Sequence, residues 1–186
     1  MNRLRIAIVA TTALALVSAC SKPADKAAAP TEQAAKAAGQ DTIGSGIAKG
    51  SKFEAAVKAA GLDATLAGPG PYTVLVPTDA AFDKLPAGAL DTLMKPTSRG
   101  DLTGLLSYHI LPGTMLSADI VKAIDAGGGK AQIATMGGGT ITATRDGDKI
   151  VLTDGAGSKA TVVAPDTKRS NGVVHEIDTV LMPAKR

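Results

Sequence analysis

Three side chains that could carry chemistry lie close together near the C-terminal end of the chain: His175, Glu176 and Asp178. An imidazole beside carboxylates is the combination used for general acid–base catalysis. Successive side chains of a β-strand point to opposite faces, however, and this segment alternates like a strand. His175 then shares a face with aliphatic residues, whereas both carboxylates lie on the other face. We therefore interpret His175 as a hydrogen-bonded packing residue, because partial burial is common for histidine.

A second possible site is a nucleophilic triad of Ser107, His109 and Asp178. Residues two apart on a helix do not face each other, so Ser107 and His109 are poorly placed for proton transfer. Ser107 also lacks the Gly-x-Ser-x-Gly surround of a nucleophile elbow. The sequence predicts no catalytic residue and no enzyme. A hydrolase is kept as a third hypothesis, which requires His109 or His175 to lie exposed in a cleft.

Metal and cofactor sites are not expected. The chain has two histidines and one cysteine, too few for a zinc site, and Asp146-Gly-Asp148 lacks the other ligands of a calcium loop. The glycine-rich runs do not open a helix after a strand, as a phosphate-binding loop does. With two Tyr, two Phe and no Trp, stacking surfaces for bases are scarce.

The first 19 residues have the order of a secretory signal peptide: basic Arg3 and Arg5, an apolar run over 6–17, then small residues. The ending Leu16-Val-Ser-Ala-Cys20 resembles the bacterial lipobox, which implies that Cys20, the single cysteine, is acylated. We expect export and a lipid anchor in the cell envelope. Ser21 resembles the sorting pattern for the outer membrane, with the protein periplasmic or surface-facing.

Charge and composition then divide the mature chain. The full sequence has a net charge of +3, which falls to +1 when Arg3 and Arg5 are removed with the signal peptide. A charge this small gives no reason to expect a nucleic-acid partner. Residues 20–42 are the predicted lipidated cysteine and an alanine-rich flexible tether, which cannot bury enough surface to fold. Residues 43–184 are long enough for one domain held by an apolar core without disulfides.

The first half of that domain reads as helical. Ser51-Lys-Phe-Glu54 has the form of a capping box, and Gly61 stands where a helix C-terminal glycine belongs. A short strand is expected over 72–76, followed by a helical turn capped by Thr78 or Asp79. Further helices are expected over 87–95, 99–109 and 117–125, the last capped by Ser117.

The second half changes to period two between glycine-rich turns. We expect strands over 131–135, 140–145, 149–153, 160–164 and 173–182. Helices first and mainly antiparallel strands second predict an α+β domain.

Three segments resemble the fasciclin domain family. They are Gly68–Phe82, Leu105–Gly113 and Asn171–Pro183, in the family's order and at its separations. The resemblance covers nearly all of 43–183 and implies a wedge-shaped β-sandwich with helices packed along it, a role in adhesion, and no typical reaction. The residues that carry the family's structural motifs are Thr78, Asp79, Phe82, Asn171, Gly172, His175 and Asp178.

Tyr108-His109 occupies the Tyr-His motif, which is implicated in receptor-dependent adhesion in some animal members. We take Tyr108, His109, Leu111, Pro112 and Gly113 as candidate contacts. The leading hypothesis is a non-enzymatic, membrane-anchored module for adhesion or contact with an unknown envelope or extracellular protein or matrix component. The alternative is a periplasmic protein that binds a small apolar ligand or lipid in a pocket between helices and sheet.

Overall fold

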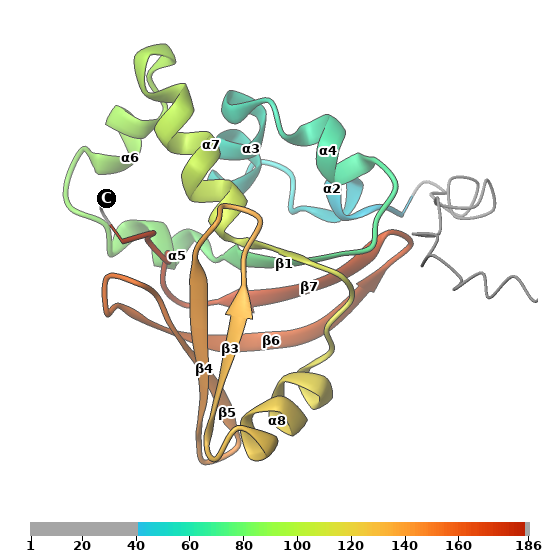
Figure 1. The fold of residues 1–186 in the computed structure, drawn as a ribbon. Coiled ribbons are helices and arrows are strands. Elements are labelled where there is room, and N and C mark those ends of the chain that lie inside the picture. Colours follow the sequence, from blue (N-terminus) through green and yellow to red (C-terminus); the bar gives the residue numbers. More distant parts are fainter. Residues whose placement is uncertain (1–40, 185–186) are drawn as a thin grey trace, which may run out of the picture.

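The structure is a computed structural model that describes residues 41–184; the predicted signal peptide, Cys20 and residues 21–40 lie outside the described residues. Most of the helices gather over one end of the sheet, and α8 lies alone beside the opposite end (Figure 1). The helices are α2 (Ile43–Gly46), α3 (Lys52–Ala60), α4 (Asp63–Ala67), α5 (Asp79–Asp83), α6 (Ala89–Leu93), the 3₁₀ turn η1 (Pro96–Ser98), α7 (Arg99–Tyr108) and α8 (Ser117–Ala126).

The strands form one seven-stranded sheet in the order β2-β1-β7-β6-β5-β4-β3. Their bounds are β1 (Tyr72–Pro77), β2 (Ile110–Pro112), β3 (Lys130–Ala134), β4 (Thr140–Asp146), β5 (Lys149–Thr153), β6 (Lys159–Arg169) and β7 (Gly172–Ile177). Neighbours are antiparallel except β1 and β7, which are parallel and join segments a hundred residues apart.

The long strand β6 turns the sheet back on itself. It pairs with β5 near its start and with β7 along the rest, and the register shifts twice between Val162 and Thr167. Such bulges bend a strand and increase its twist. The far ends of the sheet then approach each other, and the Met136 amide donates to the Ile110 carbonyl at 2.8 Å. The sheet thus wraps partly like a barrel, and the predicted α+β sandwich with packed helices is confirmed.

Two cores lie on opposite sides of β1 and β7. Val74 faces the core shared with α2, α3 and α7, whereas its neighbour Leu75 faces the core between the two halves of the sheet. Both side chains are fully buried. The central strands therefore read as nearly continuous apolar runs, which is typical of strands covered on both faces.

Local signals explain why the helices begin and end where they do. The Ser51 hydroxyl accepts from the Glu54 amide at 3.1 Å, and the Glu54 carboxylate accepts from the Gly50 amide at 2.7 Å. The predicted helix start is therefore confirmed, with the return bond made one residue earlier than in a standard capping box. Gly61 has φ of 75° and ends α3 in the left-handed region, as expected.

Several predicted elements differ from those observed. Ser117 does not cap α8: Leu116 is the N-cap residue, and the Ser117 hydroxyl is used elsewhere. Strand β6 runs on to Arg169 because the bulges absorb the break near Pro165. Strand β7 ends at Ile177 rather than at Met182, since Asp178 instead bonds back to Thr161. The short elements α2, α4 and β2 have too few residues to show a period, and the sequence did not predict them.

Candidate functional site

His175 is fully buried, and both of its ring nitrogens are occupied by backbone groups. Its Nε2 lies 2.8 Å from the Met115 carbonyl oxygen and serves as the donor, while its Nδ1 accepts from the Asp166 amide at 3.1 Å. Neither nitrogen is left to take a proton from a substrate. The interpretation of His175 as a packing residue agrees with this geometry.

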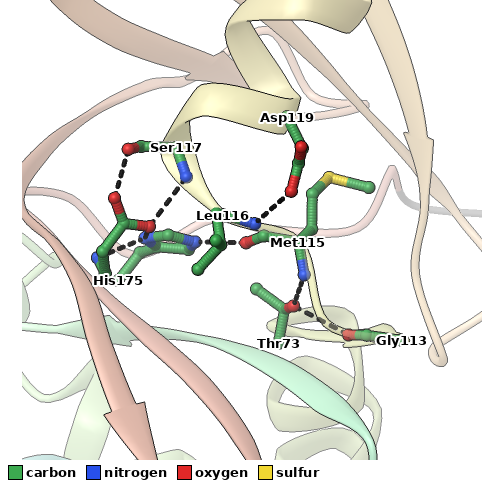
Figure 2. A network of polar contacts seen from close by, with 8 residues as sticks. Thr73, Gly113, Met115, Leu116, Ser117, Asp119 and His175 are labelled. Atoms are coloured by element: carbon green, nitrogen blue, oxygen red, sulfur yellow. Dashed lines mark hydrogen bonds and ion pairs between the residues drawn. The ribbon is translucent and has the colours of Figure 1, made fainter.

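The same histidine belongs to a polar network that holds the loop between β2 and α8 (Figure 2). The Thr73 hydroxyl donates to the Gly113 carbonyl and accepts from the Met115 amide, both at 2.8 Å. On the far side of the loop, the Asp166 carboxylate accepts from the amide and the hydroxyl of Ser117. The loop is thus fixed at both ends by side chains from two central strands and from β6.

Asp166 sits at the bulge of β6 with φ of 63°, which is uncommon for a residue other than glycine. Burial raises the pKa of its carboxyl, but the hydrogen bonds from Ser117 and the nearby Lys168 outweigh burial and lower it. The carboxylate therefore stays ionised as an acceptor for Ser117. Asp166 and Ser117 are the members of this network that the sequence did not reveal, because nothing in their spacing of 49 residues marks them as partners.

His109 is also buried, at the end of α7. Its Nδ1 donates to the Leu105 carbonyl at 2.9 Å, and its Nε2 accepts from the Leu181 amide at 3.1 Å. Burial lowers the pKa of His109 to about 4, against smaller opposing effects of the Leu105 carbonyl and Asp154. The neutral ring joins α7 to the C-terminal segment.

Tyr108 packs under the turn that joins β3 to β4. Its hydroxyl donates to the Thr140 carbonyl at 2.8 Å and accepts from the Gly155 amide at 3.1 Å, so it bridges two turns. A Cβ atom at Gly139 would lie 2.5 Å from the Tyr108 ring. The glycines of this turn therefore allow the close approach of the ring.

Asn171 and Gly172 lie where β7 begins beside the start of β1. The Asn171 amide oxygen accepts from the Ile43 amide at 2.7 Å, and its nitrogen donates to the carbonyls of Leu66 and Gly68, both at 2.8 Å. Gly172 has φ of 155°, and a Cβ atom there would lie 1.9 Å from the Tyr72 carbonyl oxygen. The Asn-Gly pair thus ties α2 and α4 to the sheet.

The other motif residues also have structural contacts. The Thr78 hydroxyl caps α5 by accepting from the Ala81 amide at 3.3 Å, and Phe82 is buried in the helical core. Asp79 accepts from the Lys52 amide at 2.9 Å, and Asp178 accepts from the Thr161 amide at 2.7 Å. These contacts join neighbouring elements and form no catalytic group.

A family model for the fasciclin domain matches residues 48–183. The chain belongs to the fasciclin domain family. The resemblance seen in the three sequence segments is therefore confirmed.

Three relatives show how far the similarity extends. Protein sll1483 of Synechocystis is 34% identical over 177 residues, which cover 93% of this chain and 87% of that protein. Immunogenic protein MPB70 of Mycobacterium bovis is 37% identical, over 61% of this chain and 51% of its own length. Human periostin is 35% identical over 72% of this chain, which corresponds to 14% of periostin. A solved FAS1 domain pair from the insect cell adhesion molecule Fasciclin I aligns with a TM-score of 0.46 at 25% identity, covering 60% of this chain and 36% of that one.

The predicted contact residues of the fasciclin domain separate into two groups. Tyr108, His109 and Leu111 are almost completely buried, which argues against them as surface contacts. Pro112 is exposed and Gly113 is partly exposed on the loop that the network holds. Exposed Thr114 follows them, and Thr114 and Leu116 line a groove of about 550 Å³ together with Pro71 and residues 168–173. We call residues 112–116 the contact loop.

Within residues 41–184, no three histidine, cysteine or acidic side chains come together as a metal site. Over the same residues, no helix is long and apolar enough to cross a bilayer.

Proposed function

We propose that this protein is a non-enzymatic module for adhesion or protein contact at the cell envelope, held there by a lipid on Cys20. Membership of the fasciclin domain family carries the proposal. The state of the two histidines supports it, because both rings are buried and bonded at both nitrogens to backbone. The hydrolase hypothesis requires one of them to lie open beside a nucleophile, and neither does.

The contact loop is the surface that we assign to the partner. A loop pinned by Thr73, Asp166 and His175 loses little conformational freedom when it binds, and preorganisation improves affinity. The adjoining groove supplies concave surface next to the exposed Pro112 and Thr114. The partner is an envelope or extracellular protein or a matrix component.

Site-specific photo-crosslinking tests this assignment. A photoreactive residue is placed at Thr114, and the full-length chain is expressed in cells and irradiated. We expect a discrete cross-linked product at Thr114. The control places the same residue at Asp148, exposed on the turn between β4 and β5. Equal products at both positions, or none at Thr114, would contradict a partner surface at this loop.

The anchor is tested separately by replacing Cys20 with Ser. The parent chain is expected in the membrane fraction, released only by detergent, and the C20S chain in the aqueous fraction. A C20S protein that still fractionates with membranes would disprove the lipid anchor without bearing on the contact loop. Separation of inner from outer membranes in the same experiment tests the sorting predicted from Ser21.

A second candidate function, binding of a small apolar ligand or lipid, has one supporting observation. A groove of about 860 Å³ lies beside α7 and is lined by Leu93, Leu105, Met182 and Pro183 among others. Apolar lining with few polar groups suits an alkyl chain. A Leu93→Asp variant should abolish binding of a fluorescent fatty acid if this groove is used; unchanged binding would exclude it.

A further inference from the structure

A smaller pocket lies between the helix-covered face of β1, β7 and β6 and the chain that joins α2 to α3. Its volume is about 180 Å³. Ile47, Val76 and Val174 give it apolar walls. The charged side chains that line it are positive at one end and negative at the other.

Arg169 forms the cationic end. Its guanidinium lies against Gly46, where a Cβ atom would come within 2.4 Å of it, so the glycine makes room for the arginine. Nη1 pairs with the Asp41 carboxylate at 2.5 Å, and Nη2 donates to the Gly46 carbonyl at 3.3 Å. The Nε is buried without a partner among the described residues. A guanidinium has five N–H donors, so this one retains capacity for another acceptor.

Glu176 and Asp79 form the anionic end. Glu176 is exposed at the pocket rim and has no ion pair within residues 41–184. One Asp79 oxygen accepts from the Lys52 amide at 2.9 Å, which leaves the other open in the described part of the chain. Neither carboxylate is neutralised by a neighbouring cation, so this end of the pocket favours a positive group.

The strand register separates the two ends. Arg169 is paired with Gly172 at the start of β7, and Glu176 lies four residues farther along the same strand. At about 3.3 Å per residue, their Cα positions are about 13 Å apart along the strand. Val174 lies between them and contributes to the apolar floor. A ligand with only a negative charge would be repelled by Asp41, Asp79 and Glu176. A ligand with only a positive charge would be repelled by Arg169.

We propose that this pocket binds a zwitterion whose ammonium and carboxylate are separated by a short alkyl chain. The carboxylate would face Arg169, the alkyl chain would lie on Val76 and Val174, and the ammonium would lie between Glu176 and Asp79. A free linear amino acid such as ε-aminocaproate has this chemistry, and so does a peptide that ends in lysine. The proposal does not depend on the function assigned to the contact loop.

Calorimetric titration of the full-length chain tests it with three probes: ε-aminocaproate, n-pentylamine and hexanoate. We expect ε-aminocaproate to bind about tenfold or more tightly than either single-charge probe, because only it satisfies both ends. Glu176→Gln should weaken that binding about fivefold, as expected for one exposed charge contact. Asp41→Asn should strengthen it, since it frees Nη1 and removes a repelling charge. Asp148→Asn, a remote exposed control, should leave it unchanged.

Equal affinity for the three probes, no binding, or a Glu176→Gln variant that binds like the parent would overturn the proposal. Because Glu176 is exposed, its variant keeps the fold, and an unchanged melting temperature checks this. Two further probes separate the sources of the zwitterion. A peptide with a C-terminal lysine that binds as well as ε-aminocaproate identifies a peptide end, whereas binding of the free amino acid alone identifies a small molecule.

Discussion

His109 is held neutral inside the protein, and the cost of charging it makes stability depend on pH. Its pKa is lowered by burial to about 4, against about 6.5 in an unfolded chain. The unfolded state therefore binds more protons between these values. The stabilisation is complete above about pH 6.5 and is lost as the pH falls toward 4, by about 3 kcal/mol in all.

We expect the parent chain to lose this stability in urea unfolding measured at steps from pH 7 to pH 4. Carboxylates also titrate toward the lower end of this range, so the comparison is with His109→Gln, which has no titrating ring. The stability difference between parent and variant should shrink as the pH falls. A difference that stays constant with pH would show that His109 does not titrate on unfolding.

Tyr108→Phe tests whether the Tyr108 hydroxyl stabilises the fold through its two hydrogen bonds. The substitution leaves the Thr140 carbonyl and the Gly155 amide without their shared partner. We expect a loss of about 0.5–1.5 kcal/mol in the free energy of unfolding, the usual net contribution of a hydrogen bond, because Thr140 and Gly155 lie at the surface.

Tyr72→Phe is the matched control, since the Tyr72 hydroxyl has no hydrogen bond within the described chain. It should change stability by less than about 0.5 kcal/mol. Equal effects of the two substitutions would contradict the role assigned to the Tyr108 hydroxyl.

At the scale of the elements, two glycines differ in whether a side chain could replace their hydrogen atom. Gly172 approaches the Tyr72 carbonyl so closely that a Cβ atom cannot fit, whereas Gly104, within α7, has open space around its Cβ position. Gly172→Ala should prevent normal folding or lower the melting temperature strongly. Gly104→Ala should stabilise the protein by about 0.5–1 kcal/mol, because alanine favours a helix. Circular-dichroism melting curves measure both, and a tolerated Gly172→Ala would disprove the close approach of Gly172 to the Tyr72 carbonyl.

The sequence predicted the elements that have a clear period or cap. The Ser51 cap, Gly61 and the alternating strands β3, β4 and β5 belong to this group. It did not predict partners that only the folded chain brings together, such as Asp166 with Ser117 or Arg169 with Asp41. The family motif predicts Tyr108 and His109 as contact candidates, but both are buried, because a motif reports which residues recur in a family and not whether they are exposed.

At the scale of the whole molecule, β1 and β7 belong to both cores, so the two halves should unfold together. Leu75→Ala removes side-chain atoms from the core between the sheet halves, yet β1 also supports the helical core through Val74. We expect Leu75→Ala to cost about 2–5 kcal/mol and to destabilise α3 and β4 equally. Hydrogen exchange measured by mass spectrometry reports both elements. Loss of protection in β4 alone would mean that the halves are independent.

The parallel pairing of β1 with β7 has a consequence for the order of events during synthesis. A chain emerges from its N-terminus, and β1 then waits about a hundred residues for the neighbour that completes its hydrogen bonds. Long-range pairing of this kind closes late, since the loop entropy is lost before the contacts form. The helical half and β1 are thus present without β7 until residues 172–177 have been released. The sheet of this domain therefore cannot be completed before β7 has left the ribosome.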